Sequence, residues 1–215
     1  SAVGALGEGS SNSLSKDTDL ALAIGTKLAD FTTGSWANFE NPNFKLVSVN
    51  TARYDTTKHL ATPVISDAKV GLQKISEALG DWKAPDDWYK RAIKEKNEWD
   101  AYVEKQSGPT NQEEPSYAHA VGAVYRNSDP SDIVVTAAGG LVGEVVQVWK
   151  PKQLNTFETE WGFSCMGYEI SGALGIKMAK PDQDVVVFVG DGSYLLNNTD
   201  ISVSYTHLTL PTTGI

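Results

Sequence analysis

The stretch from Asp184 to Tyr194 constrains the fold of this chain most, because an apolar run leads directly into two glycines that flank an aspartate. The run Val185–Val189 has no helical period, and four of its five residues are valines. This composition is typical of a parallel strand covered on both faces. We therefore predict a central, parallel, buried strand, with a carboxylate at its carboxyl end.

The Gly-Asp-Gly turn after this strand has the chemistry of a metal or anion site. Glycine lets the backbone turn sharply and approach a ligand closely, and Asp191 offers a hard oxygen ligand for Mg²⁺ or Ca²⁺. If a helix begins near Tyr194, the amides of Gly192 and Ser193 point at the same spot, where the helix dipole favours a phosphate. An ordinary Asp-Gly surface turn is the alternative. The apolar strand before the turn favours a metal-bridged diphosphate.

A second glycine-rich block, residues 161–179, lies one βαβ step upstream. Its small residues Gly172, Ala173 and Gly175 would let a helix pack closely against a sheet. A strand, a turn and a tightly packed helix in succession are expected of a phosphate-binding α/β domain.

Three blocks in order resemble the cofactor-binding half of thiamine-diphosphate-dependent enzymes: Ala137–Leu141, Gly162–Ile170 and Gly190–Leu195. More closely, they resemble the members of this family that hydrolyse a cyclic 1,2-diketone in myo-inositol catabolism. The likeness covers residues 2–201. Single motifs often mislead, whereas three in the same order rarely do. The resemblance implies thiamine diphosphate and Mg²⁺ as cofactors and a small-molecule cyclic diketone as substrate.

By this resemblance, Asp191 is the metal ligand. The residues expected to bind the cofactor are Ser164, Cys165, Met166, Gly190, Gly192 and Ser193. A backbone carbonyl near Ser164 would receive the aminopyrimidine, and Met166 would support the bent cofactor, although a core methionine is an equal alternative. Glu169 is a candidate acid or base, or else a packed or capping residue.

Composition excludes several classes of partner. The chain has 215 residues, 40% of them hydrophobic and 21% charged, which suffices for one or two cores. Its net charge of −9 argues against nucleic acid or an anionic membrane as the main partner. No apolar run has the length of a membrane span. The single Cys165 fits a reducing cytoplasm, where we expect the protein. His59, His119 and His207 lack metal-ligand spacing.

Residues 1–80 have the alternation of a Rossmann-like domain. Strands are expected at 19–26 and 44–50, and an amphipathic helix begins after Asp67 and stops at Gly80, with Val70, Leu72, Ile75 and Leu79 on or near one face. A nicotinamide site is discounted, because no Gly-x-Gly-x-x-Gly follows the first strand. The resemblance implies a middle domain with a largely structural role.

Residues 81–115 are predicted to form an interdomain helix and a linker. Aromatic and basic residues interleave there and can stack on bases, but acidic residues offset the charge and favour helix packing. The diphosphate-binding domain is expected at 116–201, with helices at 117–125 and 143–149, a strand at 132–137 and an extended segment at 155–159. Residues 202–215 depart from the family pattern and are predicted to be a foreign tail.

The fold class predicted is α/β: a Rossmann-like middle domain, then a truncated parallel α/β domain that binds thiamine diphosphate. In the family, the activating glutamate belongs to a preceding pyrimidine-binding domain, and the closing asparagine of the metal motif is expected beyond about residue 215. We therefore assign no catalytic residue and expect no turnover by this stretch alone. The intact enzyme is expected to be a homodimer or homotetramer. An acetolactate-synthase-like carboligase or decarboxylase, and a non-catalytic module on the same fold, remain alternatives.

Overall fold

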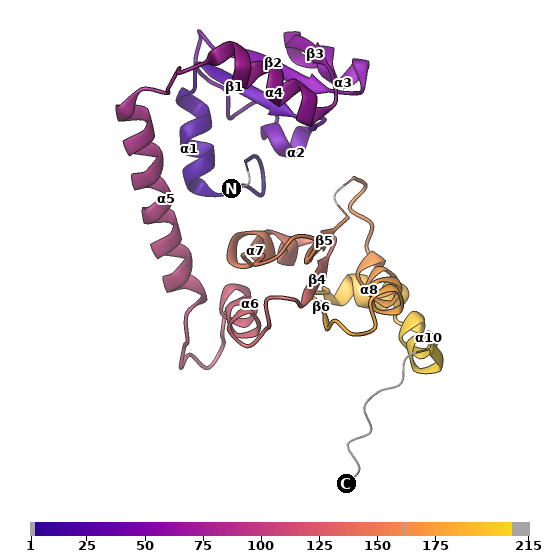
Figure 1. The fold of residues 1–215 in the computed structure, drawn as a ribbon. Coiled ribbons are helices and arrows are strands. Elements are labelled where there is room, and N and C mark those ends of the chain that lie inside the picture. The colour runs from indigo at the N-terminus through magenta and orange to yellow at the C-terminus, as the bar shows by residue number, and fades with distance from the viewer. Residues whose placement is uncertain (1–2, 161, 208–215) are drawn as a thin grey trace. The chain divides into compact units, whose positions relative to one another are not determined.

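The chain forms two compact units, residues 1–102 and 103–215 (Figure 1). The computed structural model describes residues 3–160 and 162–207, with no account of the side chains at 206 and 207. Each unit contains a three-stranded sheet with helices. The boundary falls inside the long helix α5, Asp86–Ser107. Both sheets are parallel throughout, as the α/β fold class requires.

The first unit has the strand order β1-β2-β3. Its elements before α5 are α1 (Gly9–Asp17), β1 (Leu20–Ile24), α2 (Asp30–Thr33), β2 (Lys45–Asn50), α3 (Arg53–Thr57), the short 3-10 helix η1 (Lys58–Leu60), β3 (Thr62–Ile65) and α4 (Ala68–Leu79). The central strand β2 is aligned with Leu22 opposite Val47 and with Val64 opposite Val49. Val49 is completely buried. Expected strands at 19–26 and 44–50 are thus confirmed as β1 and β2.

Helix α4 begins and ends as its sequence predicts. The Asp67 carboxylate accepts hydrogen bonds from the amides of Lys69 and Val70, and Gly80 ends the helix with a φ of 55°. Burial of its apolar face is not observed, since Val70 and Leu79 are 50% and 48% exposed. Gly71 is the residue that packs onto the sheet, where an added Cβ would lie 2.7 Å from Val49 Cγ1.

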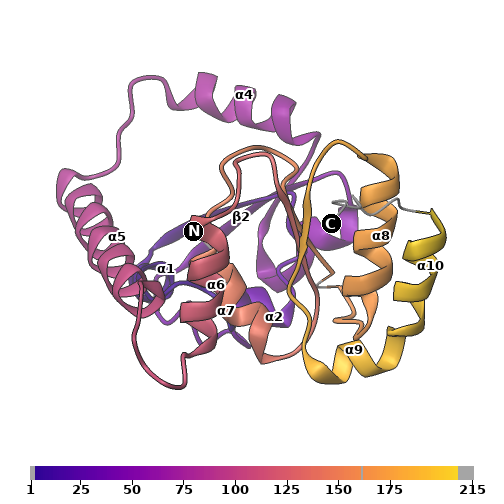
Figure 2. The same ribbon diagram turned by 90° about the horizontal axis from the view of Figure 1, so that it is seen from below.

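The second unit has the strand order β5-β4-β6. After α5 it contains α6 (Tyr117–Arg126), β4 (Ile133–Thr136), α7 (Gly140–Val148), β5 (Phe157–Thr159), α8 (Tyr168–Ala179), β6 (Val185–Val187), α9 (Asp191–Asn197) and α10 (Thr199–His207). Helices α6 and α7 pack on each other, and α8 contacts β4, β6, α9 and α10 (Figure 2). The core beneath α8 contains Ile133, Val135 and Ala173.

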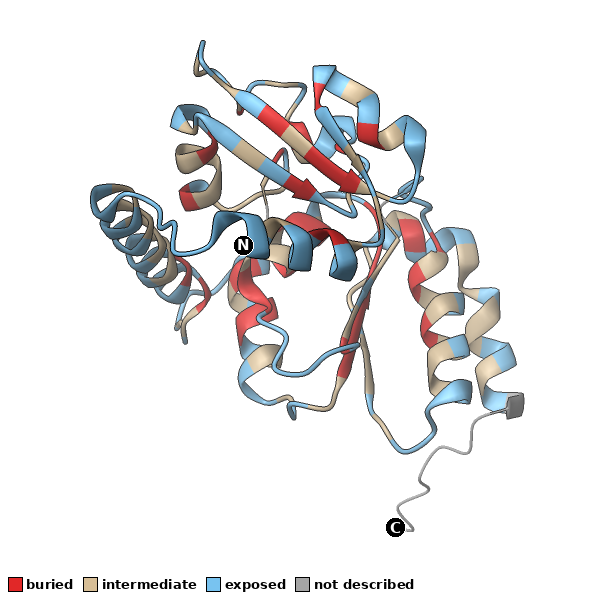
Figure 3. Cartoon of the chain, turned by 45° about the horizontal axis from the view of Figure 1, so that its top comes forward, coloured by how far each residue is buried: buried red, intermediate tan, exposed pale blue. Residues whose placement is uncertain are grey.

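Strand β4, and not β6, is central in the described part of this sheet. All four residues of β4 are buried, and buried positions also concentrate on β2 of the first unit (Figure 3). Strand β6 pairs with β4 on one side, and Val187 is 36% exposed. The prediction of a central, buried strand at 185–189 is therefore wrong for the described residues. The apolar run predicts a strand with both faces covered. It does not predict which strands pair with that strand.

Helix α10 extends beyond residue 201 into the segment predicted to be a foreign tail. It contacts α8, while residues 208–215 lie outside the described part of the chain. Among the helices that the structure describes, none combines the length and the apolar character that crossing a membrane requires.

Candidate functional site

Three strand ends meet at one edge of the second sheet. Strands β4, β5 and β6 are parallel, so their carboxyl ends lie on the same side. Each is followed by a loop and then by a helix: β4 leads to α7, β5 to α8 and β6 to α9. In open α/β sheets, ligands bind in the crevice outside the carboxyl ends of the strands. This edge is therefore the candidate site.

Asp191 is the first residue of α9 and is exposed at this edge. Its Oδ1 accepts a hydrogen bond of 2.8 Å from the Gly192 amide. The amide of Gly192 is thus directed at the neighbouring carboxylate and not at open space, which differs from the expectation of a free amide. A ligand that takes this amide must replace the aspartate oxygen. Ser193 is buried, with 3% of its surface exposed.

The loop before α8 approaches this turn through Met166. A Cβ added to Gly192 would lie 2.8 Å from Met166 Cε, so the methionine side chain covers the glycine. Met166 itself is 50% exposed, which weighs against the alternative of a core methionine. Ser164 has a φ of 52°, and the backbone bonds of Cys165 stay within residues 160–168. Of the three predicted loop residues, the structure brings Met166 to the Gly-Asp-Gly turn.

Glu160 fixes the shape of the same loop. Its Oε1 accepts from the Phe163 amide and its Oε2 from the Cys165 amide, both at 2.9 Å. These amides favour the ionised carboxylate, and they hold the pKa of Glu160 below its ordinary value of 4.5. The ionised carboxylate of Glu160 therefore holds the loop that carries Ser164 and Met166.

Protonation of Glu160 is expected to loosen this loop. Because the folded pKa is lowered, the contacts are complete above pH 4.5 and are lost as the pH falls through the folded value. The chain has a single cysteine, so a sample labelled with isotopic cysteine gives one backbone amide signal in a nuclear magnetic resonance spectrum. We expect the signal of Cys165 to titrate with a midpoint below 4.5.

The Glu160→Gln variant is the control for this titration. Its amide cannot ionise, so the Cys165 signal should not shift over the same pH range. A wild-type midpoint at or above 4.5, or an equal titration in the variant, would show that Glu160 does not hold the loop as described.

Glu169 is not placed as an exposed acid or base. It is completely buried, and both carboxylate oxygens are occupied. Oε1 accepts from the Ala138 amide at 3.2 Å and Oε2 from the Gly167 amide at 2.9 Å. The structure thus favours the packed and capping interpretation of this residue.

Several residues near this edge are not predicted from the sequence. Asn197 Nδ2 donates to the Gly167 carbonyl at 3.1 Å and to Ser171 Oγ at 2.8 Å. Thr136 and Thr159 face each other at the ends of β4 and β5, and their buried hydroxyls have no hydrogen-bond partner among the described residues. A polar residue at the end of an apolar strand is the only hint that the sequence offers.

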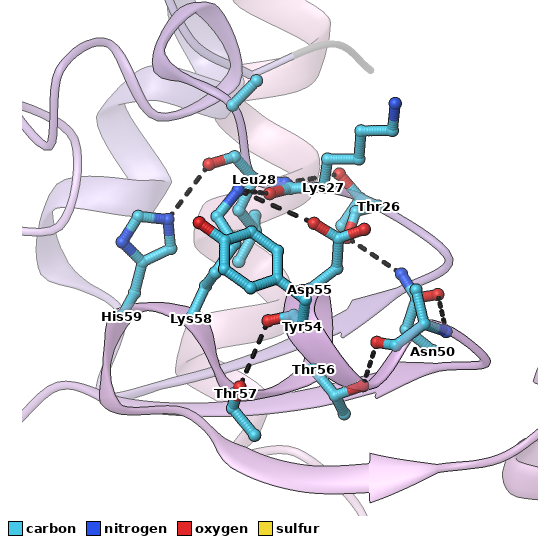
Figure 4. Close-up of polar contacts among 12 residues, drawn as sticks. Thr26, Lys27, Leu28, Asn50, Tyr54, Asp55, Thr56, Thr57, Lys58 and His59 are labelled. Carbon is cyan, nitrogen blue, oxygen red and sulfur yellow. Dashed lines mark hydrogen bonds and ion pairs between the residues drawn. The ribbon is translucent and has the colours of Figure 1, made fainter.

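In the first unit, the side chains of Asn50, Lys58 and His59 contact backbone carbonyls of the segment that follows β1 (Figure 4). Asn50 Nδ2 donates to the Thr26 carbonyl at 3.3 Å, which ties the ends of β1 and β2. Lys58 Nζ donates to the Lys27 carbonyl at 2.6 Å, and His59 Nε2 lies 3.1 Å from the next carbonyl oxygen, that of Leu28. These contacts fix residues 26–28, which follow β1. The largely structural role of residues 1–80 stays a prediction.

Metal ligands are sparse in the described residues. No group of three or more histidine, cysteine, aspartate or glutamate side chains there could hold a metal ion. His119 serves as a helix cap, since its Nδ1 accepts from the Ser116 amide. A metal ion at Asp191 would thus need oxygens from the ligand or from water, as Mg²⁺ commonly uses.

Comparison with known families decides the assignment. Residues 1–75 match the central domain of thiamine pyrophosphate enzymes, and residues 137–211 match their C-terminal TPP binding domain. The chain belongs to the thiamine pyrophosphate enzymes. The second match begins directly after β4 and contains β5, β6 and the loops and helices that surround the candidate site. Thiamine pyrophosphate is the cofactor of this domain.

Curated relatives of this enzyme family match nearly the whole chain. The 3D-(3,5/4)-trihydroxycyclohexane-1,2-dione hydrolase of Clostridium tetani is 35% identical over 94% of the chain. The proteins of the same name from Geobacillus thermodenitrificans and Lacticaseibacillus casei are 33% and 32% identical over 94% and 93% of it. The chain spans only about a third of their length, at 34–35%.

The residues at the strand ends fit a diphosphate and its metal ion. A Cβ added to Gly139, Gly140 or Gly190 would meet nothing within 4 Å, so a ligand can approach the backbone of both turns closely. The exposed Asp191 carboxylate supplies the hard oxygen that Mg²⁺ prefers. Open glycine turns beside one accessible carboxylate match what a magnesium-bridged diphosphate needs.

Proposed function

We propose that the full-length protein is a thiamine-pyrophosphate- and Mg²⁺-dependent hydrolase that cleaves a carbon–carbon bond of a cyclic 1,2-diketone in myo-inositol catabolism. The observation that carries this proposal is the match of 93–94% of the chain to relatives that share one hydrolase name. The open backbone at Gly139, Gly140 and Gly190 supports it independently, because it suits the cofactor that this chemistry uses.

Roles for the site residues follow from their positions. Asp191 would bind the Mg²⁺ ion, while the turn Gly190–Ser193 would hold the diphosphate through its backbone. Met166 covers Gly192 and would contact the cofactor, together with its loop neighbours Ser164 and Cys165. When bound, thiamine pyrophosphate supplies a carbon nucleophile for attack on a carbonyl group. The chain's own task is to bind it, orient it and fix the metal ion.

The domain boundaries at 1–80, 81–115 and 116–201 are part of the proposal. The family matches at 1–75 and 137–211 support the first and third segments. The family match continues to residue 211 and α10 continues to His207, so both weigh against a foreign segment that starts at 202. We further propose a cytoplasmic homo-oligomer, a dimer or a tetramer, as the general behaviour of the family suggests.

Product analysis tests the proposed activity. The full-length protein, supplied with thiamine pyrophosphate, Mg²⁺ and the cyclic diketone, is expected to release an open-chain acid, and omission of thiamine pyrophosphate should abolish the reaction. Parallel incubation with pyruvate separates the alternative, because acetolactate formation without diketone cleavage would identify a carboligase. Cofactor binding without either product would favour a non-catalytic module.

A further inference from the structure

Glu169 links two segments that are distant in sequence and adjacent at the candidate site. It is the second residue of α8, and its side chain ranks first by volume among the fully buried side chains of the described residues. One carboxylate oxygen accepts from Ala138, in the turn between β4 and α7. The other accepts from Gly167, at the end of the loop that follows β5. One side chain therefore joins two of the three strand ends.

A buried carboxylate in this position is stabilised locally. Burial of an ionised group is costly unless hydrogen bonds replace its hydration. Here two backbone amides donate to the two oxygens, and the first turn of a twelve-residue helix adds a favourable dipole. Glu169 can thus remain an acceptor at both oxygens without solvent. Its side chain therefore joins two backbone segments.

The third strand end is joined through Asn197. Asn197, the last residue of α9, donates to the Gly167 carbonyl. The N–H and the C=O of Gly167 are therefore held from opposite sides, by Glu169 and by Asn197. A Cβ at Gly167 would lie 2.9 Å from Asn197 Cβ, and the φ of Gly167 is 96°, so no other residue fits there easily. Met166, which covers Gly192, immediately precedes this fixed point.

We propose that Glu169 and Asn197 are positioning residues for the cofactor site. By holding Gly167, they set the spacing between the Ala138 turn, the Met166 loop and the Gly-Asp-Gly turn before any ligand arrives. The inference rests on the proposed function, because it assumes that these three segments surround the cofactor. It extends that function, because the affinity for the cofactor then depends on two side chains that need not contact the cofactor.

The Glu169→Gln variant of the full-length protein tests the clamp. A glutamine side chain has nearly the same shape but only one oxygen, and its NH₂ group would face a backbone N–H. We expect the Kd for thiamine pyrophosphate with Mg²⁺, measured by calorimetry, to rise about tenfold, because one hydrogen bond is lost and one backbone amide is left unpaired. Hydrogen exchange at the amides of Ala138 and Gly167 should become faster.

Glu144→Gln is the matched control, since it makes the same chemical change on α7 of the same unit. Its Kd and its exchange pattern should equal those of the wild type. Urea unfolding of each variant identifies conditions in which that variant is fully folded. The Kd values are compared under these conditions. A residue with a purely structural role would then leave the Kd unchanged. A Kd for Glu169→Gln within twofold of the wild type would overturn the proposal.

A second variant keeps the inference testable if Glu169→Gln does not fold. Asn197→Ala releases the other side of Gly167, and we expect about fivefold weaker cofactor binding, as for the loss of one hydrogen bond. An unchanged Kd there would also overturn the positioning role. If the wild type itself bound no cofactor, the proposed function would fail, whereas the exchange rates at Ala138 and Gly167 would still show whether Glu169 clamps the two segments.

Discussion

Replacing Asp191 with alanine in the full-length protein is expected to weaken the binding of Mg²⁺ and thiamine pyrophosphate together, by at least about 100-fold. Even changes beyond the direct ligands of a metal site cost about 10- to 100-fold in affinity, so loss of a direct ligand should cost more. The two affinities should fall together because a Mg²⁺ ion held by Asp191 would also hold the diphosphate. Calorimetry with each component, alone and in combination, measures both.

Asp182→Ala is the control for this variant. Asp182 is an exposed aspartate before β6, at the amino end of the same strand that Asp191 follows. Removing it changes the net charge equally but leaves the carboxyl edge of the sheet intact, so cofactor affinity should not change. If Asp191→Ala bound the cofactor as tightly as Asp182→Ala does, Asp191 would be a turn residue and the metal site would lie elsewhere.

The sequence predicts the position of this candidate site from local features. An apolar run specifies a strand, and the glycines after it specify a turn that only certain ligands require. The helix after Asp67 is equally local, since its cap and its terminal glycine are both read within a few residues. Such features can be predicted without knowledge of the rest of the fold.

Features that depend on neighbours distant in sequence are not predictable in this way. Strand β3 contains a proline, and three of its four residues are exposed, so it has no alternation to detect. Helix α1 is mostly polar and shows no apolar face. The order of the strands, with β4 in the centre, depends on pairing across the sheet. Each is decided by tertiary contacts that a local pattern does not contain.

Glu169 illustrates the same limit within the site. Its neighbours in sequence suggest a packed or capping residue, and its bond to Gly167 is local. Its bond to Ala138 joins residues that are 31 positions apart, and no periodicity signals it. The sequence thus predicts which loops form the candidate site, while the structure shows which side chains join those loops.

Two helical glycines are expected to respond to alanine in opposite directions. Gly122 of α6 is buried, and an added Cβ would lie 2.1 Å from the Ser107 carbonyl oxygen and 2.8 Å from Ser107 Cβ. The same carbonyl accepts a bond of 2.6 Å from Arg126 Nη1. The added Cβ would meet backbone at the end of α5, which cannot move aside as a flexible side chain can. We therefore expect Gly122→Ala to lower the free energy of unfolding by about 3 kcal/mol, the upper range for overpacking.

Gly175 of α8 is the matched position, and it corrects an expectation from the sequence. Ala173 packs onto the sheet as predicted, but Gly175 is exposed, and an added Cβ there would meet nothing within 4 Å. Gly175→Ala should therefore raise the free energy of unfolding by about 0.5–1 kcal/mol, because alanine loses less backbone entropy in a helix. Urea unfolding followed by tryptophan fluorescence compares both variants with the parent. Equal effects of the two substitutions would mean that the contact between α5 and α6 is not as described.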